Sequence, residues 1–85
     1  MPTLFYTEHS QRELAAIPQS VRIRILAAIR SLQLGSKRQT KKLKGRRGDA
    51  PLYRRRVGSY RIIYTVEKPN QIIILHIRHR KDAYT

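Results

Sequence analysis

The apolar and polar positions at the start of the chain predict a short strand followed by a short helix. Thr3 to Tyr6 is an apolar and β-branched run that fits a strand, and Thr7 ends it. Thr7 is also a good N-cap residue, and Glu8 follows it in the first turn, where the helix dipole favours an anion. We expect this helix to run to about Ala16.

A second helix is predicted from Pro18, which stops the first helix and can open the next. Gly35 stands where a C-terminal cap belongs. The apolar stripe between them has helical spacing and consists of Val21, Ile25, Ala28, Ile29 and Leu32. Three arginines lie off this stripe, and their simplest interpretation is a solvated helix face: Arg22, Arg24 and Arg30.

Residues 52–64, LYRRRVGSYRIIY, predict a β-hairpin around the Gly58-Ser59 pair, which suits a two-residue turn. In that register Val57 faces Tyr60 and Arg56 faces Arg61. Because side chains alternate along a strand, one face of the hairpin should enter the core. The residues with that parity are Tyr53, Val57, Tyr60, Ile62, Tyr64 and Val66.

Residues 71–80, QIIILHIRHR, predict a final strand with two unlike faces. The odd positions Ile73, Leu75 and Ile77 should face the helices. The even positions should share the open face, with Arg61 opposite either His76 or Arg78. That open face would gather Arg54, Arg56, Arg61, His76, Arg78 and Arg80 beside Ile63, Ile72 and Ile74.

Arg55 is the one residue that contradicts this division, because a cation has the parity of the core. Three explanations are open. The side chain reaches past an edge of the sheet, pairs with an acid, or marks a bulge that changes the register.

The arginines of the hairpin crowd a small patch. Like charges opposite one another on paired strands are destabilising, on the scale of the ~0.2–1 kcal/mol that favourable pairs contribute. Folding alone therefore gives no reason to place Arg54, Arg56 and Arg61 together, whereas binding of a polyanion does. An ordinary basic sheet face is the alternative.

Net charge strengthens the polyanion interpretation. The chain carries 19 Lys and Arg against 5 Asp and Glu, a formal net charge of +14. Most of this charge follows Gly35, so nucleic-acid binding is expected in the second half of the chain. Residues 35–50 predict a loop, either a solvated basic loop or an arm that grips phosphates. The candidate RNA- or ribosome-binding residues are Lys37, Arg38, Lys41, Lys42, Lys44, Arg46, Arg47, Arg78 and Lys81.

Length and composition predict one domain over residues 1–85 and exclude several classes of site. The chain has no cysteine, which excludes disulfides and Cys-ligated zinc. His9, His76 and His79 do not form a convincing zinc set, because no carboxylate accompanies them at ligand spacing. No signal segment or membrane span is evident, so we expect a cytoplasmic protein without metal or cofactor.

Several motifs together resemble the RelE/ParE toxin superfamily, and most closely the RelE mRNA endonucleases. They are the KLKG that ends at Gly45, the hairpin YRxRVGxYRIIY and the terminal HRKDAY at 79–84. The resemblance covers nearly the whole chain. It departs where the family often has lysine, at Arg54 or Arg56, and where it usually has an apolar residue, at Arg55.

The resemblance implies a fold, an activity and a site. The fold is α+β, a small antiparallel sheet in the order β-α-α-β-β-β with the two N-terminal helices packed on one face. The activity is cleavage of mRNA in the ribosomal A site until an antitoxin covers the toxin. By position, the catalytic residues are Arg54, Arg56, Arg61, Arg80 and Tyr84.

The chemistry of these residues fits RNA cleavage without a metal, because RNA supplies its own nucleophile in the 2′-OH. Arginine forks suit the phosphate and remain charged, which makes them poor bases. The base could then be Tyr84 or one of two histidines, His76 and His79, unless orientation and charge stabilisation supply most of the rate. For His79 a structural hydrogen bond is the alternative, and for Tyr84 a frayed tail.

Three functions remain open at this stage. The first is a ribosome-dependent endoribonuclease whose partners are the ribosome with bound mRNA and an acidic antitoxin. The toxin alone would then be a monomer, and its antitoxin complex hetero-oligomeric. The second is a ParE-like poison of DNA gyrase, and the third is a non-enzymatic basic RNA-binding protein.

Overall fold

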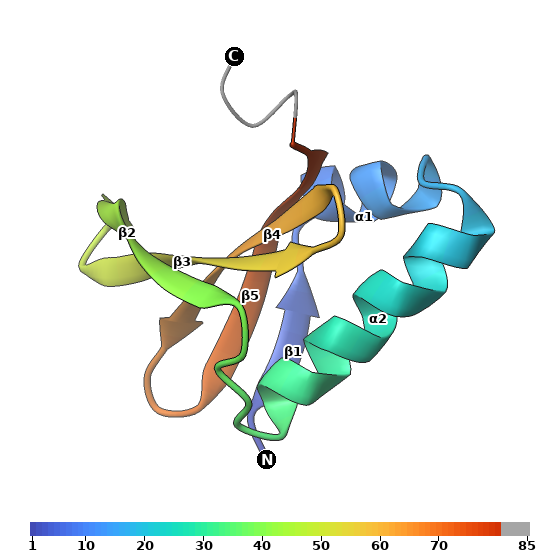
Figure 1. Cartoon of the computed structure of the whole chain (residues 1–85). Helices are drawn as coiled ribbons and strands as arrows, with labels where there is room; N and C mark the ends of the chain where they lie inside the picture. Colours follow the sequence, from blue (N-terminus) through green and yellow to red (C-terminus); the bar gives the residue numbers. More distant parts are fainter. Residues whose placement is uncertain (81–85) are drawn as a thin grey trace.

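The computed structural model describes residues 1–80 and shows two helices and five strands (Figure 1). Their order is β1 (Thr3–Tyr6), α1 (Glu8–Ala15), α2 (Gln19–Gln33), β2 (Thr40–Arg47), β3 (Ala50–Val57), β4 (Tyr60–Glu67) and β5 (Gln71–His79). The α+β class and the strand-helix-helix start are confirmed. Among residues 1–80, no helix has the length and apolar character needed to cross a membrane.

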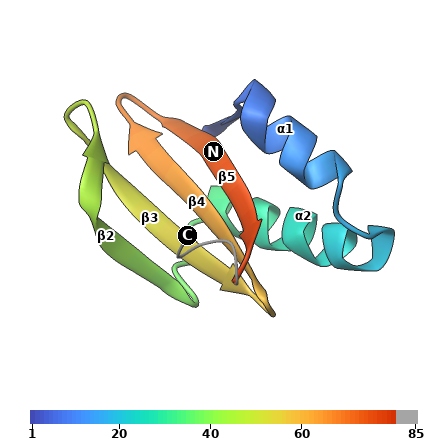
Figure 2. The ribbon, with the colours of Figure 1, turned by 90° about the horizontal axis from the view of Figure 1, so that it is seen from above.

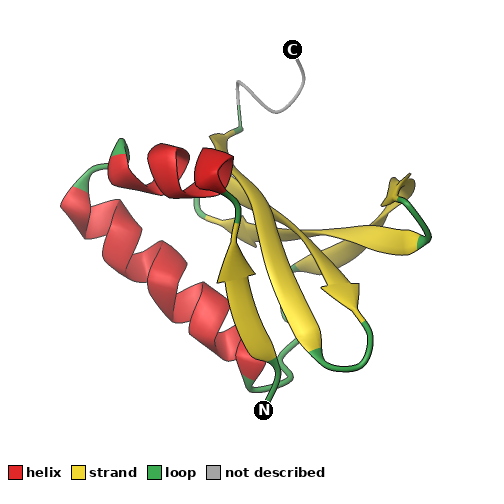
Figure 3. Ribbon diagram, turned by 180° about the vertical axis from the view of Figure 1, so that it is seen from behind, coloured by secondary structure: helices red, strands yellow, loops and turns green. Residues whose placement is uncertain are grey.

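The five strands form one mixed sheet in the order β1-β5-β4-β3-β2. β1 runs parallel to β5, and the three other pairs are antiparallel. α2 lies against one face of this twisted sheet, and α1 lies beside the edge of β5 (Figures 2 and 3). The β2–β3 hairpin extends away from them. We call the face of β3, β4 and β5 that is turned away from α2 the open face.

The core joins α2 to the central strands. Ile25, Ile29 and Leu32 of α2 are buried in one cluster with Ile62 and Tyr64 of β4 and with Ile72, Ile74 and Ile77 of β5. The apolar stripe predicted for α2 therefore faces the sheet. Val66 was expected in this core, but its side chain is 44% exposed.

The ends of the helices follow the predicted caps. The Thr7 hydroxyl accepts a hydrogen bond from Ser10 N at 3.1 Å and lies 3.3 Å from the carbonyl oxygens of Ile74 and Leu75. Gly35 has φ +91°, a left-handed conformation that glycine adopts without strain, and Ser36 N donates to Ser31 O across the end of α2. Thr7 thus ties the start of α1 to the middle of β5.

The predicted loop over residues 35–50 is wrong, because Thr40–Arg47 form strand β2 at the edge of the sheet. Its pairing with β3 is interrupted between Lys42 and Arg46. This irregularity breaks the alternation on which a strand is recognised, and lysines are common on edge strands, where they discourage pairing with other chains. A basic run without periodicity therefore resembles a loop in sequence.

Half of the facing predicted for β5 is also wrong. Ile63 pairs with His76 but Tyr64 pairs with Ile74, so a register shift at Leu75 exchanges the two faces of the strand. Ile72 and Ile74 are consequently buried in the core rather than on the open face. Beyond the shift, Ile77 is buried as expected, and His76 and Arg78 have the parity of the open face.

The β3–β4 hairpin has the predicted register. Arg56 pairs with Arg61 and Val57 with Tyr60, and Gly58 has φ +57° at the turn. Arg55 pairs with Ile62 and lies on the helix side without a bulge in this hairpin. Within residues 1–80, no acidic side chain forms an ion pair with it. Of the three explanations offered for Arg55, the bulge and the acidic partner are therefore not observed.

Candidate active site on the open face of the sheet

Three arginines form a row across three adjacent strands. Arg61 of β4 pairs with Arg56 of β3 on one side and with Arg78 of β5 on the other. Neighbouring strands lie about 4.8 Å apart, so the three side chains start close together on the open face. We call Arg56, Arg61 and Arg78 the arginine row. Of the two partners predicted for Arg61, Arg78 is the one observed.

A small hollow of ≈ 130 Å³ opens at the turn end of this row. Arg56, Arg61 and Arg80 line it, together with Gly58, Ser59 and Tyr60, and none of its described lining residues is acidic. Arg61 is only 8% exposed, and Arg80 is held by its backbone N–H, which donates to Ser59 O at 2.6 Å. The turn at Gly58 therefore brings three predicted catalytic arginines around one space of a size suited to a phosphate group.

A second row on the open face lies next to the first. Arg54 pairs with Lys41 of β2 and with Ile63 of β4, and Ile63 pairs with His76 of β5. Arg54 thus shares the open face with the arginine row but does not line its hollow. Lys41 joins the open face because β2 is a strand, which the sequence did not indicate.

Beside the second row is a hollow of ≈ 380 Å³ with an apolar floor and a basic rim. Leu52, Ile63 and Leu75 contribute the apolar side chains. The polar side comes from Thr7, His9, Arg46, Arg47 and His76. Two of the predicted RNA-binding residues, Arg46 and Arg47, are therefore placed near His76.

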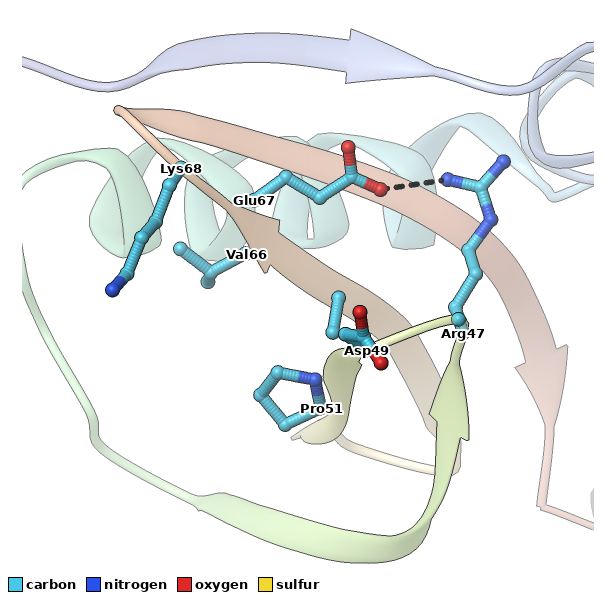
Figure 4. A pocket seen from close by; sticks show the side chains of 8 residues that line it. Arg47, Asp49, Pro51, Val66, Glu67 and Lys68 are labelled. Carbon is cyan, nitrogen blue, oxygen red and sulfur yellow. Dashed lines mark hydrogen bonds and ion pairs between the residues drawn. The ribbon is translucent and has the colours of Figure 1, made fainter.

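A larger hollow, ≈ 640 Å³, lies elsewhere and has a different character (Figure 4). Asp49 and Glu67 are among its lining residues, and Glu67 pairs with Arg47 at 3.3 Å. Carboxylates repel a phosphate backbone, so size alone does not identify the anion-binding site on this protein.

Glu13 is a site residue that sequence reasoning missed. Its Oε1 accepts from Ile77 N at 2.9 Å and lies 3.7 Å from His76 Nδ1, and its Oε2 lies 3.4 Å from Arg78 Nε. β1 pairs only with residues 71–74 of β5, so beyond them the edge of β5 is open to α1. The carboxylate thus satisfies a backbone N–H at that edge and pairs with Arg78, with His76 close beside it.

The expectation that no carboxylate accompanies the histidines is therefore wrong. His9 and Glu13 are one helical turn apart on α1, with His9 Nε2 3.4 Å from Glu13 Oε1. His76 completes a group of three whose ligand atoms lie within 4.8 Å of one another. The i, i+4 spacing was visible in the sequence, but the packing of α1 on β5 that adds His76 was not. Two N–H donors already occupy the carboxylate.

The surroundings of His76 favour the neutral form of its imidazole near pH 7. Burial lowers the pKa of His76 most, and the charge of Arg78 lowers it further, while Glu13 acts in the opposite direction. A neutral imidazole next to a carboxylate is a proton acceptor, which agrees with the role considered for His76. Its ring meets the edge of His9 at a centroid distance of 4.8 Å.

His79 lies on the opposite side of β5 from His76. It pairs with Tyr60 and contacts that ring edge-to-face at 5.2 Å. This placement separates His79 from the arginine row and fits the structural alternative. Tyr84 and Lys81, predicted for catalysis and for RNA binding, lie outside the described residues.

Comparison with known proteins places this arrangement in a family. A family profile for the "ParE toxin of type II toxin-antitoxin system, parDE" matches residues 4–84. The chain belongs to the RelE/ParE superfamily of type II toxin–antitoxin toxins. The resemblance inferred from the hairpin and the terminal motif is thereby confirmed at the level of the superfamily. No curated protein sequence matches this chain significantly.

Solved structures of toxin–antitoxin complexes share the fold of this superfamily member. A chain of the archaeal RelE-RelB complex from Pyrococcus horikoshii is 30% identical with a TM-score of 0.78, and the match covers 93% of this chain and 94% of that one. A chain of the RelB-RelE complex from Methanococcus jannaschii is 32% identical with a TM-score of 0.76, covering 94% of each. The RelBE2 complex from Mycobacterium tuberculosis matches at 31% identity and TM-score 0.62, covering 94% of this chain and 100% of that one.

The environment of His76 predicts a pH-dependent stability. Because the folded pKa of His76 lies below its unfolded value of about 6.5, the unfolded chain binds more protons between the two values. Stability from the neutral imidazole is complete above about pH 6.5 and is lost as the pH falls toward the folded pKa. Urea unfolding from pH 7.5 to 5 should therefore show a steeper loss for the wild type than for His76→Gln.

The matched control is His79→Gln, on the other side of the same strand. That variant should retain the pH dependence of the wild type, whatever its stability at pH 7.5. Equal pH slopes for the wild type and His76→Gln would show that His76 is not held neutral by its surroundings.

Proposed function

We propose that this toxin is a ribosome-dependent endoribonuclease that cleaves mRNA in the A site and so inhibits translation in the cytoplasm. The observation that carries the proposal is the hollow lined by Arg56, Arg61 and Arg80, to which no acidic residue within 1–80 contributes. A cluster of fixed cations around a phosphate-sized space suits a phosphodiester whose charge increases in the transition state.

The reaction would begin with attack of the 2′-OH on the adjacent phosphorus. Arg61 is buried, so its guanidinium group would be positioned before substrate binds, and the backbone of Arg80 is held by Ser59 beside it. Donors fixed in advance need little reorganisation as charge develops on the phosphorane oxygens. Arg54 and Arg56 would hold the neighbouring backbone, and no step requires a metal.

Proton transfer has two candidates in this proposal. His76, with its lowered pKa and its carboxylate partner Glu13, is suited to accept the 2′-OH proton. Tyr84 is the other candidate, from the resemblance to the family. The hollow of Leu52, Ile63 and Leu75 beside His76 offers an apolar floor for a base and basic side chains for its phosphates.

Products distinguish this proposal from its competitors. The purified toxin should cut mRNA on programmed ribosomes and leave a 5′-OH end with a 2′,3′-cyclic or 3′-phosphate on the other fragment. Gyrase-dependent DNA breaks with intact mRNA would instead support a ParE-like poison. Binding to RNA without cleavage would support a non-enzymatic RNA-binding protein.

Replacement of Arg61 tests the site within that assay. Arg61→Gln removes a donor aimed at the developing charge, and such donors are typically worth about 10²–10³ in rate. We expect cleavage to fall by that factor. The control is Arg30→Gln, which loses the same charge from an exposed position on α2. Near-normal cleavage by a folded Arg61→Gln protein would remove Arg61 from the active site.

The antitoxin partner should recognise the same charge. Relatives of similar fold occur in complexes of RelE with RelB. We propose that the cognate antitoxin covers the open face or the adjacent sheet edge with an acidic segment, because the net charge of this toxin is +14. The complex would be hetero-oligomeric and the free toxin monomeric.

Salt dependence measures that charge complementarity. Toxin–antitoxin association should slow as NaCl rises from about 50 to about 500 mM, because the screening length for exposed charges falls from about 14 to about 4 Å across this range. Stopped-flow or surface-binding measurements of the association rate would show it. A cognate antitoxin whose neutralising segment is neutral or basic, or an association rate independent of salt, would contradict the proposal.

A further inference from the structure

A second basic hollow lies on the helix side of the hairpin, apart from the hollow of the arginine row. It measures ≈ 440 Å³, and its walls come from α2, from the segment before β2 and from the β3–β4 hairpin. Its polar lining residues are Arg24, Arg38, Gln39, Arg55 and Arg56. Four of these five carry a guanidinium group, and no acidic residue of the described part of the chain lines the hollow.

Arg55 is the buried member of this group. Its side chain is on the helix side of β3, opposite Ile62, and the residue is only 6% exposed. Its Nη1 atom is buried and has no hydrogen-bond partner within residues 1–80. A buried charge without a partner is strongly unfavourable, and an unsatisfied donor adds to that cost. The folded chain therefore keeps a cation whose partner is not among its described residues.

No neighbour within the described residues can neutralise Arg55. Tyr64 is close enough for the two side chains to interact electrostatically, but burial raises the pKa of Tyr64 above its ordinary value despite the opposing effects of Thr40 and Arg55. Tyr64 therefore remains an uncharged phenol near pH 7. Among residues 1–80, no side chain supplies the missing negative charge.

Arg24 and Arg38 surround the opening toward solvent. A Cβ placed on Gly58 would lie 3.4 Å from Arg24 Nη2, so this guanidinium rests against the hairpin turn. Arg38 precedes Gln39, whose carbonyl accepts a hydrogen bond from Arg56 N at 3.1 Å and so fixes this segment against β3. Arginines from α2 and from the segment before β2, which are distant in sequence, therefore meet at the same hollow.

We propose that this hollow is an oxyanion site that binds a phosphate group, with Arg55 at its base and Arg24 and Arg38 at its mouth. A guanidinium offers five N–H donors in a planar fork that matches phosphate oxygens. A phosphate provides more acceptor oxygens than a single carboxylate and so satisfies more of the converging donors. The phosphate could belong to an RNA backbone or be free in solution.

The buried arginine of this site is not part of the proposed cleavage reaction, because Arg55 lies on the opposite side of the sheet from Arg61. The two hollows share Arg56 and Gly58 at the end of the hairpin. If it binds RNA, the toxin would hold nucleic acid on both sides of its hairpin, which would orient it on a folded RNA target. If it binds free phosphate, it would couple the stability of the fold to the phosphate concentration.

Nuclear magnetic resonance of the arginine Nε–H groups tests the site directly in the full-length protein. The Arg55 signal is identified by its absence from an Arg55→Met variant, and the Arg30 signal serves as an exposed reference. Inorganic phosphate is titrated at constant ionic strength against chloride. We expect a saturable shift of the Arg55 signal with the Arg30 signal unchanged.

Two further titrations distinguish the sources. A short 2′-O-methyl RNA cannot be cleaved through its 2′ position, and it should shift Arg55 at a concentration at least tenfold below that of phosphate if the ligand is an RNA backbone. A shift with phosphate but not with RNA supports the site and assigns it to free phosphate. A shift with polyglutamate alone, or with none of the three, overturns the proposal.

Thermal unfolding gives a second measurement. Phosphate should raise the Tm of the wild type and of Arg30→Met above their values in chloride of equal ionic strength, and at least half of that rise should be lost in Arg55→Met. An unchanged rise in Arg55→Met contradicts the proposal. If Arg55→Met does not fold, Arg55→Lys identifies the signal, and the wild-type titration decides.

Discussion

The cross-strand contact between Arg56 and Arg61 is the constraint on which the functional surface depends. Glycine at position 58 allows the chain to turn with a positive φ, and the turn sets the pairing of the two arginines. The next strand adds Arg78 to the row. Three like charges side by side oppose folding, so the core between α2 and the sheet must supply the stability that keeps them in place.

The helices do more than cover the sheet. α2 buries Ile25 and Ile29 against β4 and β5, which holds the strands that carry the arginine row. α1 contributes Glu13, whose carboxylate receives the Ile77 N–H where β1 no longer pairs with β5. The same carboxylate pairs with Arg78 and lies 3.7 Å from His76 Nδ1. A backbone requirement at a sheet edge and the electrostatics of the candidate site are therefore met by one residue.

Sequence reasoning predicted correctly those features that depend only on neighbouring residues. The Gly58 turn, the register of Arg56 with Arg61 and the cap at Thr7 each depend on a few adjacent residues. It failed at β2, where a register irregularity and an edge position removed the alternation, and at Leu75, where a shift in pairing exchanged the faces of β5. The grouping of His9 and Glu13 with His76 depends on the packing of a helix against a distant strand, for which spacing gave no sign.

Arg55 shows how a local contradiction in sequence can indicate a feature of the structure. Three explanations were open for a cation at this core position. In the structure Arg55 is almost fully buried, and no acidic residue among 1–80 pairs with it. Two arginine-lined hollows therefore lie on the two sides of one hairpin. We propose that both hollows bind anions.

A double-mutant cycle on the unfolding free energy tests this central claim most directly. Arg56→Gln, Arg61→Gln and the double variant are compared with the wild type by urea unfolding at low salt. If the arginine row opposes folding, Arg61→Gln will change the unfolding free energy more favourably in the wild-type background than in the Arg56→Gln background. The difference should be a few tenths of a kcal/mol. A coupling energy of the opposite sign would mean that the two arginines stabilise one another in the fold, and would contradict the account.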